Sequence, residues 1–103
     1  MMGKPYSIEI SDEAEYDLDN SYEYYFEDSP IVGDAFFKRI NISFESIKRI
    51  PYSFPEVYKN IRKFTVKKFP FVIYFQVEEY TIKVIAIFHT SRNPEVWNES
   101  DDK

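Results

Sequence analysis

The chain has 103 residues and a mass of 12.4 kDa, so we expect residues 1–103 to form a single domain with one core. Hydrophobic residues make up 44% of the sequence and aromatic residues 19%, which excludes intrinsic disorder. Two glycines, no cysteine and one histidine exclude a glycine-rich phosphate loop, a disulfide scaffold and a Cys- or His-rich metal site. We therefore expect no cofactor.

The sequence also contains no apolar segment for a membrane. No stretch approaches the roughly 20 apolar residues that span a bilayer, and the first ten residues have no apolar signal region. We expect a cytoplasmic protein with no membrane partner.

The net charge of −5 is unevenly distributed along the chain. Residues 1–30 have a net charge of −8, residues 31–92 of +6 and residues 93–103 of −3. Five basic residues of the middle segment follow one another with no acid between them: Lys59, Arg62, Lys63, Lys67 and Lys68. This run indicates either a surface for an anionic partner or solvated charges that discourage pairing at a sheet edge.

The first predicted element is a short strand over Tyr6–Ile10, where apolar and polar residues alternate. Ser11 is typical of a helix N-cap, and acids in the first turn complement the helix dipole. A helix to about Asp28 then has one apolar face, formed by Ala14, Leu18, Tyr22 and Tyr25.

A second helix is predicted to begin at Ser29-Pro30, with serine as the cap and proline at the first helical position. Its apolar stripe is Phe36, Ile40, Phe44 and Ile47. Pro51 ends this helix, because the residue before a proline disfavours the helical conformation, and residues 51–55 are predicted to form a connecting loop.

Beyond the loop the period changes from about 3.6 to 2, which predicts strands over Val57–Val66, Phe71–Glu78 and Thr81–His89. Short connections favour an antiparallel meander of these three strands. In the last strand we expect one face to present Ile82, Val84, Ala86 and Phe88, and the other Lys83, Ile85, Ile87 and His89. Because both faces are largely apolar, this strand is expected to be central. Residues 1–4 and 98–103 are expected to be frayed.

Two single residues invite a functional interpretation. His89 ends the last predicted strand and is able to exchange protons near neutral pH, but a histidine there also fits a structural role of hydrogen bonding to a loop. Trp97 fits an anchor for the C-terminal segment or a platform that stacks on RNA bases. We favour the structural interpretation of both.

The order of elements, taken with particular residues, resembles the RelE/ParE superfamily of bacterial type II toxin–antitoxin toxins, and its ParE-type pattern most closely. The residues that resemble it are Arg62, residues 69–75, residues 82–89 and residues 92–97, and more loosely Ala14, Asp17, Leu18, Tyr24, Tyr25, Ala35, Phe36, Pro51 and Pro55. The resemblance implies an α+β fold with both helices on one face of a single sheet. It also implies a growth-inhibiting toxin, of the kind used in plasmid stabilisation, that is neutralised by a cognate antitoxin protein.

Three alternative functions remain open: two classes of toxin and a non-toxic relic. ParE-like members bind DNA gyrase and perform no chemistry, whereas RelE-like members are endonucleases that cut mRNA in the ribosome. In the RelE-like alternative, His89 would donate or accept a proton, and Arg62, Lys68 and Arg92 would stabilise the phosphate charge. The third alternative is a non-toxic relic that still binds antitoxin.

We favour the ParE-like alternative, because the isoelectric point is near 4.9 and Trp97 is the only aromatic residue after Phe88. The residues expected to contact the target or the antitoxin are Lys59, Arg62, Lys63, Lys67, Lys68, Arg92 and Trp97.

Overall fold

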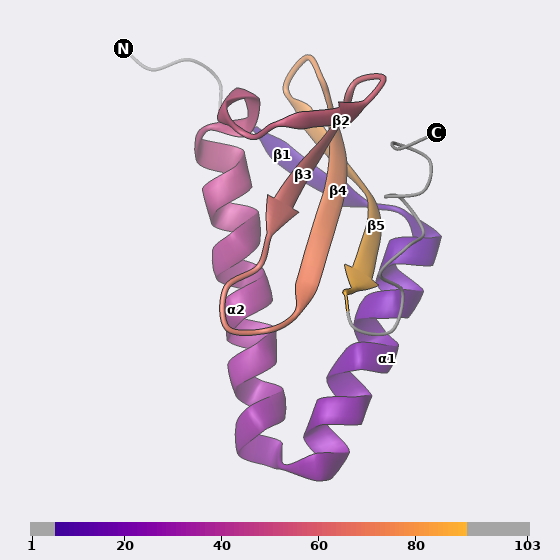
Figure 1. The fold of residues 1–103 in the computed structure, drawn as a ribbon, viewed down its shortest axis with the longest axis vertical. Helices are drawn as coiled ribbons and strands as arrows, with labels where there is room; N and C mark the ends of the chain where they lie inside the picture. Colours follow the sequence, from indigo (N-terminus) through magenta and orange to yellow (C-terminus); the bar gives the residue numbers. More distant parts are fainter. Residues whose placement is uncertain (1–5, 91–103) are drawn as a thin grey trace.

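A computed structural model describes residues 6–90, which form two helices and a five-stranded sheet (Figure 1). The elements in chain order are β1 (Ser7–Ile10), α1 (Asp12–Asp28), α2 (Pro30–Arg49), the short 3₁₀ helix η1 (Pro51–Ser53), β2 (Glu56–Tyr58), β3 (Ile61–Thr65), β4 (Phe71–Glu78) and β5 (Thr81–His89). The strand order is β1-β5-β4-β3-β2, with β1 parallel to β5 and the other pairs antiparallel. The expected α+β fold, with helices on one face of a single sheet, is confirmed. The ends expected to be frayed, residues 1–4 and 98–103, lie outside the described residues.

Both helices begin where their capping residues predict. The Ser11 hydroxyl accepts a hydrogen bond from the N–H of Ala14 at 3.0 Å, and the Ser29 hydroxyl accepts one from the N–H of Val32 at 3.4 Å. Two short serine side chains therefore separate the first strand from α1 and α1 from α2.

The prediction of one strand over residues 57–66 is wrong, because the chain reverses direction within this range. Lys59 and Asn60 form a two-residue turn between β2 and β3, and Tyr58 pairs with Ile61. Asn60 adopts a left-handed conformation with φ of 61°, which asparagine tolerates better than most residues. The N–H of Asn60 also donates to the Glu56 carboxylate at 2.7 Å. The meander thus has four strands instead of three.

The predicted faces of β5 are also wrong beyond Val84. Tyr74 pairs with Ala86 but its neighbour Phe75 pairs with Val84, so Ile85 is an extra residue that forms a β-bulge. The bulge reverses the alternation, and the next core residue of β5 after Val84 is Ile87. β5 does lie between β1 and β4, as its apolar faces predict.

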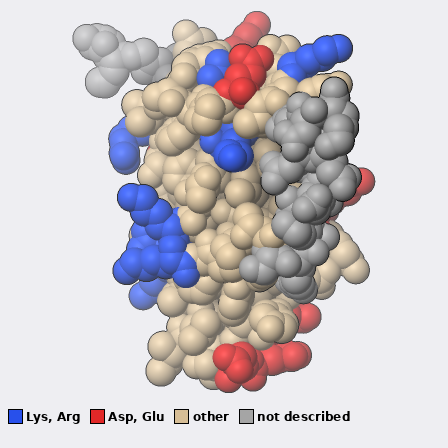
Figure 2. Space-filling model, in the orientation of Figure 1, with Lys and Arg blue, Asp and Glu red and all other residues tan. Residues whose placement is uncertain are grey.

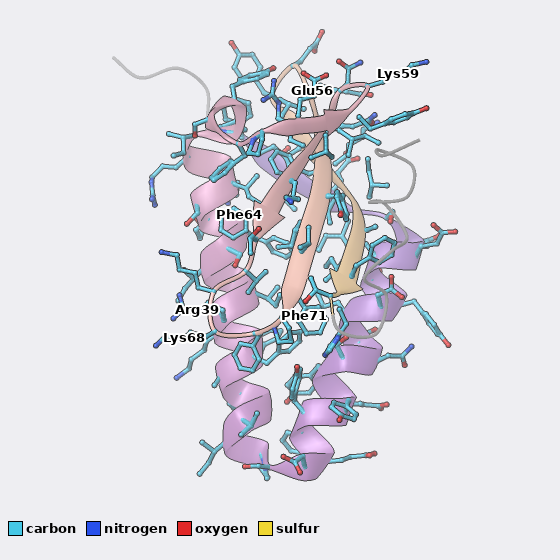
Figure 3. All side chains as sticks on the ribbon, in the orientation of Figure 1. Arg39, Glu56, Lys59, Phe64, Lys68 and Phe71 are labelled. Carbon is cyan, nitrogen blue, oxygen red and sulfur yellow. The ribbon has the colours of Figure 1, made fainter. Side chains whose placement is uncertain are left out.

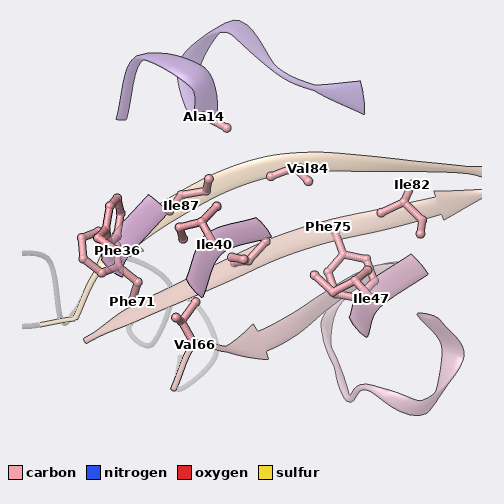
Figure 4. Packing of buried hydrophobic residues seen from close by; sticks show 11 residues of the cluster. Ala14, Phe36, Ile40, Ile47, Val66, Phe71, Phe75, Ile82, Val84 and Ile87 are labelled. Carbon is pink, nitrogen blue, oxygen red and sulfur yellow. The ribbon is translucent and has the colours of Figure 1, made fainter. Parts of the chain in front are cut away.

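The main core lies between the helices and the sheet (Figure 4). Phe36 of α2 packs against Phe71 of β4, with ring centroids 5.1 Å apart, and both rings are fully buried. The aliphatic members of the main core are Ala14, Ile40, Ile47, Val66, Ile73, Ile82, Val84 and Ile87. A second, smaller cluster occupies the opposite sheet face and consists of Ile61, Val72, Tyr74 and Ala86.

The two helices lie in close contact at Gly33. A β-carbon built on Gly33 would lie 2.7 Å from the Cα of Phe26 and 2.8 Å from its Cβ. Because the first of these atoms is backbone, the contact cannot be relieved by a change of rotamer. The absence of a side chain at residue 33 thus sets the separation of α1 and α2.

We predict that Gly33→Ala destabilises the protein by about 1–2 kcal/mol, because the overpacking cost exceeds the gain in helix propensity. Denaturant unfolding measures the effect. Asn41→Ala, at an exposed position of the same helix, is the control and should leave the stability unchanged or slightly higher. A Gly33→Ala variant as stable as the parent would show that the helices separate at no cost.

Candidate functional site

His89 lies on the helix-covered face of the sheet, at the end of β5. It pairs with Phe71 across the β4–β5 ladder, and the two rings meet edge to face with centroids 4.9 Å apart. Its side chain is partly buried. The histidine therefore packs against the margin of the main core.

Arg62 binds the loop that follows α2. Its Nη1 donates to the carbonyl oxygen of Phe54 at 2.7 Å and to that of Tyr52 at 3.4 Å, and its guanidinium carbon lies 5.1 Å from the centroid of the Tyr52 ring. Its Nη2 is 4.0 Å from the Glu56 carboxylate. Arg62 thus holds η1 and the following residues against β3.

The structure does not bring Arg62 and His89 together. Arg62 pairs with Phe75 and His89 with Phe71, so the two residues are separated by four positions along β4 and lie on opposite sides of that strand. Four positions correspond to about 13 Å, at about 3.3 Å a residue. The two side chains cannot act on the same phosphate without rearrangement.

The four lysines of the basic run are divided among three places, apart from Arg62. Lys59 lies in the β2–β3 turn, 6.0 Å from the centroid of the Tyr58 ring. Lys63 pairs with Tyr74 and faces away from the helices. Lys67 and Lys68 lie in the turn between β3 and β4 (Figure 3). Arg92 and Trp97, the other two predicted contact residues, lie outside the described residues.

Sequence reasoning missed Arg39, which belongs to α2 and is far from the basic run along the chain. Figure 3 places Arg39 and Lys68 at the same edge of the molecule, and Figure 2 shows basic side chains gathered there. Arg39 follows the buried Phe36 by three residues, but helix periodicity alone does not say which loop lies beside it. We call Arg39, Lys67 and Lys68 the α2–turn patch.

The acidic residues gather on α1, and one of them has a perturbed titration. Partial burial, and secondarily the carboxylate of Glu13 one helical turn earlier, raise the pKa of Asp17 above its ordinary 3.8. Tyr16 and Tyr24, which fall off the apolar face of α1, have exposed fractions of 68% and 59%. The helix therefore presents acids and tyrosines to its surroundings.

Two hollows lie on the described part of the surface. One, of about 350 Å³, lies on the helix pair and is lined by Leu18, Asp19, Tyr22 and Phe37. The other, of about 260 Å³, lies where β1 meets α1 and is lined by Glu9, Ile10, Ser11, Glu13, Gln76, Lys83, Val84 and Ile85. At the second hollow, a hydrogen bond to Glu78, with an Nζ–Oε1 distance of 3.1 Å, raises the pKa of Lys83.

Residues 6–90 contain no group of three or more His, Cys, Asp or Glu side chains placed to hold a metal ion. Neither α1 nor α2 is long and apolar enough to cross a membrane.

We predict that Arg62→Gln lowers stability by about 1–2 kcal/mol, because the loop carbonyls lose a charged donor. Thermal and denaturant unfolding measure this loss. Lys63→Gln removes the same charge from the next residue on the opposite face and should change stability by less than half as much. Equal stabilities of the two variants would contradict the role of Arg62 as a loop anchor.

We also predict that Asp17→Asn stabilises the protein at pH 7. The folded state raises the pKa of Asp17, so its ionised form disfavours folding above that pKa, and the effect disappears below the ordinary value of 3.8, where the residue is protonated in both states. Melting temperatures should show a gain at pH 7 that shrinks as the pH falls toward 4. Asp19→Asn, at an exposed position of α1, should give a smaller gain at pH 7; a gain that grows with falling pH would contradict the assignment.

Comparison with known proteins places this fold in a family. The model of the family described as "ParE toxin of type II toxin-antitoxin system, parDE" matches residues 8–94. A solved structure titled "Chromosomal ParDE TA system from P. aeruginosa" superimposes with a TM-score of 0.65 at 21% identity, over 82% of this chain and 95% of the other. No curated protein sequence matches significantly. A toxin of such a system has a cognate antitoxin as its partner, and this chain belongs to the ParE toxin family of type II toxin–antitoxin systems.

Proposed function

We propose that this protein is a cytoplasmic toxin that inhibits growth by binding DNA gyrase and is neutralised by its cognate antitoxin. The observation that supports this function best is the separation of Arg62 from His89, together with the family match over residues 8–94. A toxin that inhibits by binding needs a shaped surface, whereas a nuclease needs a proton-transfer group and cations around one phosphate.

RNA cleavage requires its catalytic groups to lie close together, which distinguishes a nuclease from an inhibitor that acts by binding. A general acid or base must lie within about 3 Å of the proton it transfers, and the groups that stabilise the transition state must lie equally close to the developing charge. Arg62 is already engaged by the carbonyl oxygens of Tyr52 and Phe54. To reach a phosphate near His89 it would have to leave both.

A pulse-labelling experiment tests the proposed target. The protein is induced in a bacterial host without antitoxin, and incorporation of labelled thymidine and labelled methionine is followed over the first minutes. We expect thymidine incorporation to fall first, and purified protein to inhibit supercoiling by purified gyrase. Co-expression of the antitoxin should restore growth.

Variants of His89 separate binding from catalysis. His89→Gln removes the imidazole, the candidate proton-transfer group, but retains a planar polar side chain beside Phe71, so growth inhibition should stay within about twofold of the parent. If methionine incorporation falls first and His89→Gln abolishes the effect, the protein is a RelE-like nuclease and the proposal is wrong. If neither label is affected and the protein does not inhibit gyrase, it is a relic, and the proposal is equally wrong.

A further inference from the structure

The turn between β3 and β4 has an unusual backbone for its sequence. Lys68 has φ of 75°, in the left-handed region that glycine and asparagine adopt more easily than lysine. Lysine adopts this conformation at a higher free-energy cost than glycine or asparagine would. Such a cost persists where the surrounding structure holds the backbone in place, and it directs attention to what the side chain does.

The turn is held on both sides. The Phe69 ring packs edge to face on those of Tyr25 and Phe36, with both centroid distances at 5.3 Å, and Val66 on the other side of the lysines is 4% exposed. The N–H of Val66 donates to the carbonyl oxygen of Phe71 at 2.9 Å.

A further backbone bond closes the end of the turn, from the N–H of Thr90 to the carbonyl oxygen of Pro70 at 2.7 Å. The backbone that presents Lys67 and Lys68 is therefore fixed before any partner arrives, which lowers the entropy cost of binding.

A third cation joins them from α2. The contact between Phe36 and Phe69 sets α2 against the turn, and Arg39 lies one helical turn beyond Phe36. The ion pairs within residues 6–90 are Lys48–Glu45, Arg62–Glu56 and Lys83–Glu78, and none includes a residue of the α2–turn patch. Arg39 and Lys68 thus lie at one edge of the molecule (Figure 3), Lys67 precedes Lys68 in the turn, and no carboxylate of residues 6–90 is ion-paired with any of the three.

We propose that the α2–turn patch binds the phosphate backbone of a nucleic acid duplex. Lysine ammonium groups and an arginine guanidinium are the donors that proteins use for phosphate oxygens. The large exposed hydrophobic side chains of the described residues include Phe37 and Ile42 of α2 but none from the turn, residues 66–70, so the two lysines have no exposed ring beside them in the turn to stack on unpaired bases. These features favour sequence-independent contact with a backbone.

The overall charge of the protein sets the strength of this interaction. A net charge of −5 opposes attraction at long range, but screening limits that effect to about 8 Å at physiological ionic strength. The acids of α1 also belong to a different helix from Arg39. Binding is therefore weak and sensitive to salt. It does not depend on the gyrase proposal, since the contact needs no second protein.

Fluorescence anisotropy with a labelled 20-base-pair DNA duplex tests the proposal. Each phosphate contact contributes about −0.9 to the slope of log K against log salt concentration, so three contacts predict a slope between about −2 and −3 from 50 to 200 mM salt. The Lys67→Gln/Lys68→Gln variant should bind at least tenfold more weakly, and its slope should be shallower by about 1–2. Lys59→Gln/Lys63→Gln makes the same change of charge elsewhere and should stay within about threefold of the parent.

A second variant separates binding from folding. Lys68→Asn removes the cation while placing a residue that tolerates positive φ, so its melting temperature should equal or exceed that of the parent although binding weakens.

An RNA duplex of the same sequence identifies the source of the phosphates. Comparable binding of the DNA and RNA duplexes supports recognition of the backbone alone, and preference for either duplex identifies the natural ligand within the proposal.

Three results would overturn the inference. They are no binding of either duplex at 50 mM salt, equal weakening by the two double variants, and preferential binding of single strands. Because the assay contains no gyrase, each result leaves the gyrase proposal to be decided by the labelling and supercoiling experiments.

Discussion

The contacts of the Phe71 ring determine how the rest of this protein is arranged. Phe71 meets Tyr25 of α1, Phe36 of α2 and His89 of β5, with centroid distances of 6.2, 5.1 and 4.9 Å. One buried ring on β4 therefore joins both helices to the sheet. Aromatic pairs of this kind contribute about 0.5–1.5 kcal/mol each beyond the burial of their area, a substantial fraction of the stability of a small domain.

This aromatic cluster also decides which charged residues remain available to a partner. Phe69 extends it to the β3–β4 turn, and so Lys67 and Lys68 are presented on a fixed backbone beside α2. Arg62, only five residues earlier, is engaged by carbonyl oxygens of the preceding loop. Cations that are close neighbours in sequence therefore serve different purposes, one in stability and the others at the surface.

Much of the fold could be predicted from local chemistry. The caps at Ser11 and Ser29, the proline after α2 and the strands β4 and β5 agree with the pattern of residues. The turn at Lys59-Asn60 was missed because it lacks the glycine of the common two-residue hairpin turns, and the left-handed tolerance of Asn60 alone is a weak signal. The bulge at Ile85 was missed because β5 is apolar on both faces, so no change of pattern marks the reversal.

The sequence by itself determined the class of fold and the two ends of each helix, because caps, prolines and apolar periodicity act over a few residues. The family followed from the resemblance of particular residues to the ParE-type pattern, and the family match agrees with it. Only the tertiary structure decided where the candidate residues lie relative to one another. His89 and Arg62 are separated by the register of three strands, whereas Arg39 and Lys68 are joined by the packing of Phe36 on Phe69. Register and packing depend on contacts between distant segments, and the order of residues along one chain does not specify those contacts locally.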